Sequence, residues 1–230
     1  MAYTYDQARP LLTVENIILS YENKQIKALL IQRKHDPFKG EWALPGGPVA
    51  INESLEEAAS RHLSDQSGID DAYIEQFYTF GAVDRDPRGR SVSVTYYALI
   101  NSDDMALDPG AEALSAAWFN IYELPELAFD HAEILEFAIN RLKEKLKYES
   151  IGFNLLPRDF TLSDLQRLIE TITGKSLDKR NFRKKILGLN ILKESMVIKS
   201  KNNKPLATLY HFDWEEFEKM KSESSKLTLF

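Results

Sequence analysis

The stretch 47–69, GPVAINESLEEAASRHLSDQSGI, constrains the fold more than any other part of the chain. It follows a loop rich in Gly and Pro, EWALPGG. Asn52 or Ser54 can cap a helix here, because their side chains accept hydrogen bonds from the free amides of a first turn. Acidic residues then occupy the first turn, apolar residues recur at helical spacing, and Gly68 can end the helix. The stretch therefore predicts a glycine loop that leads into a capped amphipathic helix.

The same stretch resembles a Nudix box, the motif with which Nudix hydrolases hold divalent metals against a diphosphate. Its frame is complete, with fixed points at Gly47, Glu53, Arg61, Gly68 and Ile69. The positions that carry metal-binding carboxylates in those hydrolases are occupied by His62, Asp65 and Gln66. Magnesium prefers hard oxygen ligands, and only one of the three keeps a negative charge. The resemblance implies a Nudix fold, whereas the substitutions predict a chain that is no hydrolase and requires no metal or other cofactor.

The remaining charged residues of the box have simpler explanations. A salt bridge between Glu53 and Arg61 would fix the loop to the helix. Glu57, Arg61 and Asp65 lie four residues apart, which is typical of a surface ion-pair ladder. An alternative is a weak Nudix pyrophosphatase whose metal is held by Glu56, Glu57 and Asp65. His62 is expected to be a surface or packing residue.

Composition indicates where such a chain works. The 230 residues allow one large domain or two smaller ones, and the absence of Cys excludes disulfides and thiolate metal sites. The N-terminus lacks the features of a secretory signal, and no apolar run is long enough to span a bilayer. These features predict a cytoplasmic protein.

Charge is distributed unevenly along the chain. Residues 1–150 carry 14 Lys and Arg against 25 Asp and Glu, whereas residues 151–230 carry 15 against 10. An acidic part followed by a basic part indicates two modules, one of which meets a polyanion. A solvated basic surface is the alternative. We expect two domains, at 1–150 and 151–230.

The first domain is predicted to combine strands and helices. Its strands have alternating or branched apolar residues, and a second amphipathic helix closes the domain. This order predicts an α+β fold, an α/β/α sandwich. The expected strands are 11–20, 26–33, 73–80, 92–100 and 116–119, and the closing helix is 134–146.

The second domain is predicted to be a winged helix-turn-helix. A helix opens with a capping pattern at Thr161 and stops at Gly174, and a basic helix follows at 177–187. Two short strands, 192–200 and 207–212, form a hairpin with a basic tip. A recognition helix of this kind contacts the phosphates and base edges of the major groove. The candidate DNA-binding residues are Thr161, Lys179, Arg180, Asn181, Arg183, Lys184, Lys201 and Lys204.

A second loop, DRDPRGR at 84–90, contains three Arg in six residues and can clamp a diphosphate. An ordinary solvated hairpin tip is the alternative. Trp42 can stack on a base or pack in the core. The candidate effector-binding residues are Trp42, Gly46, Gly47, Arg85 and Arg88.

Nearly the whole chain resembles the NrtR family of Nudix-related transcriptional regulators. Four segments carry the resemblance: GEWALPGG with the altered box, FGAVDRDPRGRSVSVTYYALI, FDHAEILEFAINRLKEKLKYESIGFNLLP and FTLSDLQRLIETITGKSLDKRNFRKKIL. The resemblance implies a homodimer on a palindromic operator that represses genes of NAD metabolism and is relieved by ADP-ribose or a related nucleotide. A sister group responds to arabinose instead. An adaptor whose winged helix binds an acidic protein is a further alternative.

Overall fold

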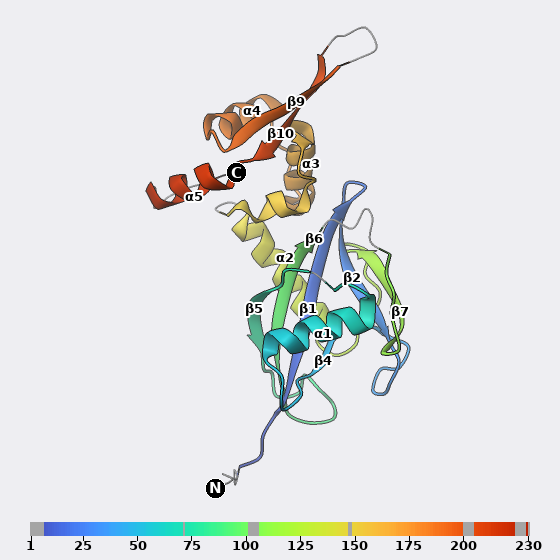
Figure 1. Cartoon of the computed structure of the whole chain (residues 1–230). Helices are drawn as coiled ribbons and strands as arrows, with labels where there is room; N and C mark the ends of the chain where they lie inside the picture. Colours follow the sequence, from blue (N-terminus) through green and yellow to red (C-terminus); the bar gives the residue numbers. More distant parts are fainter. Residues whose placement is uncertain are drawn as a thin grey trace. The chain divides into compact units, whose positions relative to one another are not determined.

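Figure 1 shows the computed structural model of the chain. It describes residues 7–70, 72–100, 106–146, 149–199, 205–223 and 229. These residues form two compact units, one up to Phe137 and one from Ala138 onwards, and the short segment Ser20–Ile26 and the residues Leu99 and Ile100 group with the second unit. The predicted border between domains at 150 and 151 lies inside the second of these units and stays a prediction.

The first unit is built on one sheet with the strand order β3-β2-β1-β6-β5, in which β4 also pairs with β1 and β7 with β2. The predicted strands are all present, with ends that differ by a few residues. The short strands β3 and β4 are not predicted, because two or three residues carry no periodic signal. The strands are β1 (Leu11–Glu22), β2 (Gln25–Arg33), β3 (Trp42–Ala43), β4 (Gly46–Pro48), β5 (Glu75–Phe80), β6 (Ser91–Ile100) and β7 (Ala113–Asn120).

Helix α1 (Leu55–Ser67) begins and ends as the sequence predicts. Ser54 rather than Asn52 caps it, accepting from the amide of Glu57, whose carboxylate accepts from the amide of Ser54 in return. Gly68 ends the helix with a left-handed φ of 75°. The cap fixes where the helix starts relative to the glycine loop.

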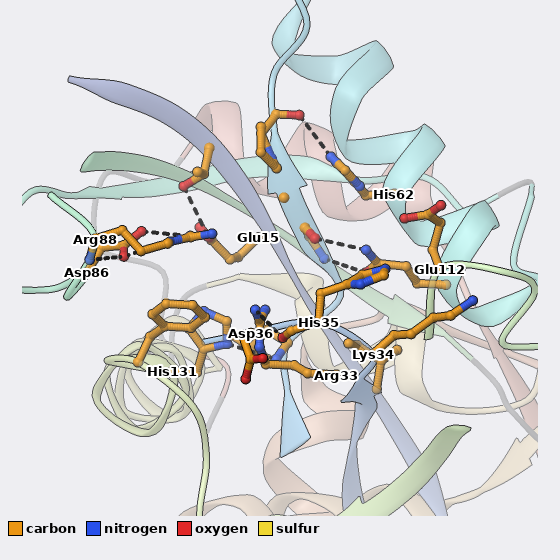
Figure 2. Close-up of a pocket in the computed structure, with 18 of the residues that line it drawn as sticks. Glu15, Arg33, Lys34, His35, Asp36, His62, Asp86, Arg88, Glu112 and His131 are labelled. Atoms are coloured by element: carbon orange, nitrogen blue, oxygen red, sulfur yellow. Dashed lines mark hydrogen bonds and ion pairs between the residues drawn. The ribbon is translucent and has the colours of Figure 1, made fainter. Parts of the chain in front are cut away.

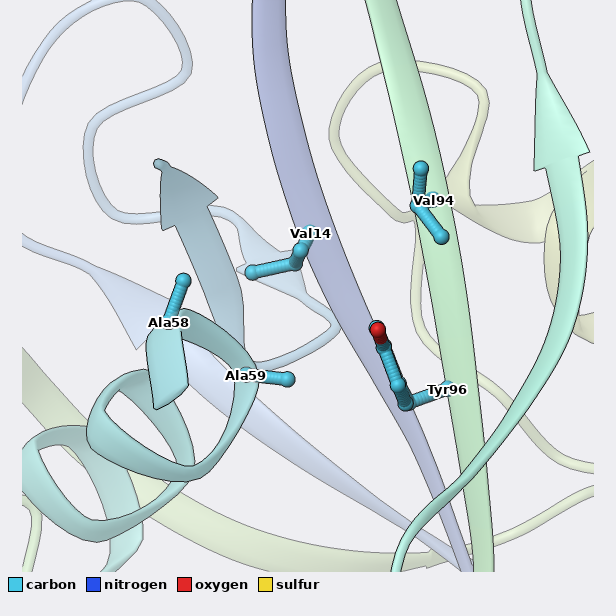
Figure 3. Packing of buried hydrophobic residues seen from close by; sticks show 5 residues of the cluster. All are labelled: Val14, Ala58, Ala59, Val94 and Tyr96. Atoms are coloured by element: carbon cyan, nitrogen blue, oxygen red, sulfur yellow. The ribbon is translucent and has the colours of Figure 1, made fainter. Parts of the chain in front are cut away.

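Small side chains let α1 approach the sheet closely, as Figure 3 shows. Ala58 and Ala59 are fully buried against Val14 of β1 and against Val94 and Tyr96 of β6. This packing fixes α1 above the central strand β1. The glycine loop and the box residues are therefore held beside the same strand.

Helix α2 (His131–Lys145) corresponds to the predicted closing helix. Figure 1 shows α1 in front of the sheet and the start of α2 behind it. The ring of Phe137 contacts the rings of Phe77, Tyr78 and Phe80 of β5. The first unit is thus a sheet between two helices, which confirms the predicted α+β sandwich.

The second unit has the order of a winged helix. Its sheet has the strand order β8-β10-β9, and the hairpin of β9 and β10 forms the wing. The strand β8 and the last helix, α5, are not predicted from the sequence. The elements are the 3-10 helix η1 (Ser150–Leu155), β8 (Phe160–Thr161), α3 (Leu162–Thr173), α4 (Lys179–Gly188), β9 (Leu192–Lys199), β10 (Pro205–Phe212) and α5 (Trp214–Glu223).

Caps again set the helix ends. Thr161 and Asp164 form the predicted capping box of α3, and Gly174 ends that helix with a φ of 68°. Helix α4 begins at Lys179 rather than at Leu177, because Asp178 caps it by accepting from the amide of Asn181 at 2.8 Å. The predicted apolar face of α3 is buried, and it comprises Leu162, Leu165, Leu168, Ile169 and Ile172. Among the described helices, none has the length and apolar character needed to cross a membrane.

Candidate effector cleft and nucleic-acid interface

A cleft of about 180 Å³ opens in the first unit, beside β1 and the glycine loop (Figure 2). Its walls come from β1, β2, β4, α1, the loop 84–90 and the start of α2, so residues far apart in sequence meet there. The lining residues used below are Thr13, Glu15, Arg33, Gly46, Gly47, Pro48, His62, Gln66, Arg85, Asp86, Arg88, Phe129 and His131.

Two of the altered box positions bind the protein backbone. Gln66 accepts from the amide of Gly46 at 2.8 Å and donates to its carbonyl at 2.9 Å. Nε2 of His62 lies 2.9 Å from the carbonyl oxygen of Pro48, an acceptor that favours the tautomer with the proton on Nε2. Burial lowers the pKa of His62, which favours the neutral imidazole. Both side chains therefore hold β4 in place, and His62 is a packing residue rather than a surface one.

The glycines of β4 are required by these contacts. A Cβ on Gly46 would overlap the backbone carbonyl of Val14, and a Cβ on Gly47 would lie 2.6 Å from the imidazole of His62. No side chain fits at either position without displacing β1 or α1. The two predicted effector-binding glycines thus line the cleft with backbone alone.

The acidic residues of the box are engaged with other partners. Glu53 and Arg61 form the predicted salt bridge at 2.6 Å, and this hydrogen bond lowers the pKa of Glu53 to about 2. Arg61 also lies 4.0 Å from Asp65, but Glu57 takes part in the helix cap instead of the predicted ladder. Glu56 accepts from the hydroxyl of Tyr96 at 3.1 Å.

The box does not fit a divalent ion. Two of its former ligand positions bond to β4, as described above, and among the described residues no three His, Asp or Glu side chains are grouped to hold a metal. Magnesium needs several oxygen ligands around one point. This part of the chain thus serves as a support for the cleft wall.

The predicted arginines of the 84–90 loop have different surroundings. Arg85 is almost fully buried, donates two hydrogen bonds of 2.8 Å to Asp130 and donates a third to Ser91. Its donors are largely satisfied, so it fixes the loop to the start of α2. Arg88 is half exposed, although it also donates twice to Asp86 and lowers the pKa of that carboxyl.

An aromatic platform carries two guanidinium groups in the cleft. Those of Arg33 and Arg88 lie 4.7 and 5.5 Å from the ring centre of Phe129. Stacked guanidiniums of this kind suit a diphosphate, since each retains planar donors at its edge. The place of Arg33 in the cleft is not predicted from the sequence, because a basic residue at a strand end is common and carries no specific signal.

Trp42 does not line the cleft. Its indole packs edge-on against the ring of Phe119, with centres 4.6 Å apart. The side chain is half-buried in this packing, and its predicted contact with an effector stays a prediction.

The floor of the cleft contains two buried titratable groups that sequence analysis does not predict. Glu15 is 6% exposed, and burial raises its pKa to about 7. His131 is 4% exposed, accepts from the amide of Leu44 through Nδ1, and has its pKa lowered to about 3 by burial. The sequence offers one sign of the buried Glu15, which is a Glu inside the apolar run TVENIILS.

The second unit presents the predicted basic helix with its cations outwards. Phe182 and Ile186 of α4 are buried. Four of the predicted DNA-binding residues have exposed side chains on this helix, namely Lys179, Arg180, Asn181 and Lys184.

Arg183 differs from its neighbours on α4. It is half-buried, donates to the hydroxyl of Ser163 at 3.3 Å, and lines a groove of about 460 Å³ between α3, α4 and β10. Thr161, at the edge of this groove, caps α3 with its hydroxyl. Lys201 and Lys204, predicted at the tip of the wing, lie outside the described residues.

Comparison with known families accounts for both units. The Nudix domain family matches residues 12–137, and the NrtR DNA-binding winged helix domain matches residues 152–212. The ADPR responsive transcriptional repressor NtrR of Acinetobacter baylyi is 36% identical over 217 residues, or 93% of this chain and 86% of that protein. The chain belongs to the NrtR family of Nudix-related regulators. This confirms the resemblance predicted from the four sequence segments.

Two further relatives of this NrtR-family chain are informative. The NrtR of Shewanella oneidensis, solved with a 27mer DNA, superposes with a TM-score of 0.73 at 32% identity and covers 90% of this chain and 95% of that one. Its Nudix domain, solved with ADP ribose, has a TM-score of 0.55 at 38% identity, covering 60% and 94%. An ADP-ribose pyrophosphatase of Methanocaldococcus jannaschii is 37% identical over 127 residues, or 55% of this chain and 72% of that protein.

Proposed function

We propose that this chain is a transcriptional repressor whose Nudix unit binds ADP-ribose and whose winged helix binds operator DNA. The observation that carries the proposal is the cleft, in which Arg33 and Arg88 stack on Phe129 while the former metal positions hold β4. Such a cleft has cations for a diphosphate, whereas two of the three metal-binding carboxylates of a Nudix box are replaced, by His62 and Gln66. The regulated genes in this proposal are those of NAD metabolism.

The effector is bound mainly through positive charge, because the amide of Gly46 already donates to Gln66. Arg88 is half exposed and can exchange its pairing with Asp86 for the diphosphate, while Gly46 and Gly47 line the same wall of the cleft with backbone alone. Arg85 contributes by holding the loop that carries Arg88. Trp42 supports the sheet from outside the cleft.

The operator is bound by two copies of the chain. In each copy α4 enters the major groove, so that the spacing of the half-sites follows from the geometry of the dimer. ADP-ribose weakens DNA binding if it binds one arrangement of the dimer better than the other. A coupling free energy of ~1–3 kcal/mol is typical of such regulation.

Binding without turnover distinguishes this proposal from a weak pyrophosphatase. We expect calorimetric titration with ADP-ribose to give a saturable heat with no magnesium present, and chromatography after overnight incubation with magnesium to recover the nucleotide intact. The physical reason is that Glu56, Glu57 and Asp65 are occupied by Tyr96, the helix cap and Arg61. Release of AMP that requires magnesium, and that stops when those three carboxylates are changed to amides, would instead establish the enzyme.

A further inference from the structure

Glu15 is a buried carboxylate in a cleft that is also lined by four cations and three further carboxylates, namely Arg33, Lys34, Arg85, Arg88, Asp36, Asp86 and Glu112. It lies on β1 at the floor of the cleft, between the loop 84–90 and β4 (Figure 2). The hydroxyl of Thr13 donates to its Oε1 at 3.1 Å, and its Oε2 has no hydrogen-bond partner. Within the described part of the chain, no Lys or Arg forms an ion pair with it.

The charged residues nearest to Glu15 form ion pairs with one another. Arg85 is paired bidentately with Asp130, and Arg88 with Asp86. These pairs leave Glu15 only the more distant attraction of Arg85, which does not offset the cost of burying its charge. An orphaned buried acceptor is costly, and native proteins retain such groups where a ligand or a reaction uses them.

Thr13 and Glu15 both offer hydrogen-bond acceptors, so a group that binds them must donate hydrogen bonds. Thr13 is 5% exposed and also lines the cleft, and its hydroxyl oxygen can still accept while its proton is donated to Glu15. The terminal torsion of a Glu side chain is broad, so either carboxylate oxygen can turn towards the cleft. The two residues together therefore present two adjacent acceptors.

We propose that Thr13 and Glu15 bind the vicinal diol of a ribose of the effector, one hydroxyl donating to each residue. This inference rests on the proposed function and names the part of the nucleotide that the floor of the cleft recognises. A phosphate would be repelled by the carboxylate, and the diphosphate belongs with Arg33 and Arg88. A metal ion would need further acidic ligands around the same point, and the part of the chain that the structure describes groups no three His, Asp or Glu side chains to hold one.

The test is a cycle that combines variants of the protein with analogues of the ligand. Glu15→Gln keeps the shape of the side chain and removes its charge, and Thr13→Val removes the hydroxyl in the same way. Affinities are measured by calorimetry for ADP-ribose and for two analogues, each lacking the 2′-hydroxyl of one ribose. For the wild-type chain we expect one analogue to bind roughly 10- to 100-fold more weakly than ADP-ribose.

Because each hydroxyl donates to one residue, the gap between ADP-ribose and that analogue should shrink to about twofold in whichever of Glu15→Gln and Thr13→Val removes the partner of the missing hydroxyl, and should persist in the other. Glu41→Gln makes the same chemical change at an exposed residue outside the cleft and should keep the full gap. An unchanged gap in both floor variants, or equal affinity of the wild-type chain for all three ligands, overturns the diol assignment alone. Failure of the wild-type chain to bind ADP-ribose overturns the proposed function together with it.

Discussion

The double variant Arg180→Ala, Lys184→Ala is expected to bind operator DNA roughly 10- to 100-fold more weakly than the wild-type chain at physiological salt. Both side chains are exposed and lie one turn apart on α4, so neither is needed for the core. Their loss removes attraction to phosphates without disturbing Phe182 or Ile186, which anchor the helix. ADP-ribose affinity should be unchanged, because the cleft lies in the other unit.

Salt dependence gives this prediction a second readout. The slope of log affinity against log salt should become shallower by about 0.9 for each phosphate that the variant no longer neutralises. The matched control is Lys219→Ala, Lys221→Ala, which removes two exposed charges from α5 of the same unit. If the control weakens binding as much as the α4 variant does, general charge rather than a recognition helix explains the affinity. An unchanged affinity of the α4 variant would remove α4 from the interface.

Glu15→Gln is expected to make the protein more stable at pH 8. The folded-state pKa of Glu15 is about 7, above the ordinary value of 4.5, because burial penalises the charged form. Such a group favours the folded state when protonated, so the wild-type chain loses stability as the pH rises from about 4.5 to about 7. The shift corresponds to an upper limit of ~3 kcal/mol, which the amide should recover.

Urea unfolding at a series of pH values measures this effect. The difference in the free energy of unfolding between the variant and the wild-type chain should be largest above pH 7, because the pKa of Glu15 in the folded chain is about 7. The difference should vanish towards pH 4.5, the ordinary pKa of this carboxyl. Glu41→Gln, an exposed residue, should show no gain. If the variant is no more stable than the wild-type chain at pH 8, the surroundings of Glu15 offset the cost of burying its charge. A gain together with loss of diol recognition would mean that stability is sacrificed for binding.

The sequence predicted those features that depend on local signals. Ser54 and Thr161 cap helices where the pattern placed them, and Gly68 and Gly174 end these helices. The altered box predicted the Nudix fold because its spacing survives even where its carboxylates do not, and the segments at 129–157 and 160–187 carried the resemblance to the regulator family. The roles of His62 and Gln66 could not be predicted, because the backbone of β4 that they hold is brought to them only by the fold.

The cleft itself was predicted in part. Gly46, Gly47, Arg85 and Arg88 line it, although Arg85 is largely satisfied by Asp130, and Trp42 packs against Phe119 instead. That these residues bind an effector stays a prediction. Arg33, Phe129, Glu15 and Thr13 come from three separate segments, and no local pattern links them. A strand residue such as Glu15 shows its importance only when burial and the absence of a partner are known.

Fluorescence anisotropy on the DNA upstream of the chain's own gene distinguishes a repressor that responds to ADP-ribose from one that responds to a sugar. The protein is bound to the labelled duplex and titrated with ADP-ribose and, separately, with L-arabinose. We expect ADP-ribose to lower the DNA affinity by roughly 5- to 150-fold, the range of common allosteric couplings, and L-arabinose to leave it unchanged. Specific binding that ADP-ribose does not alter, or release by L-arabinose alone, would contradict the account.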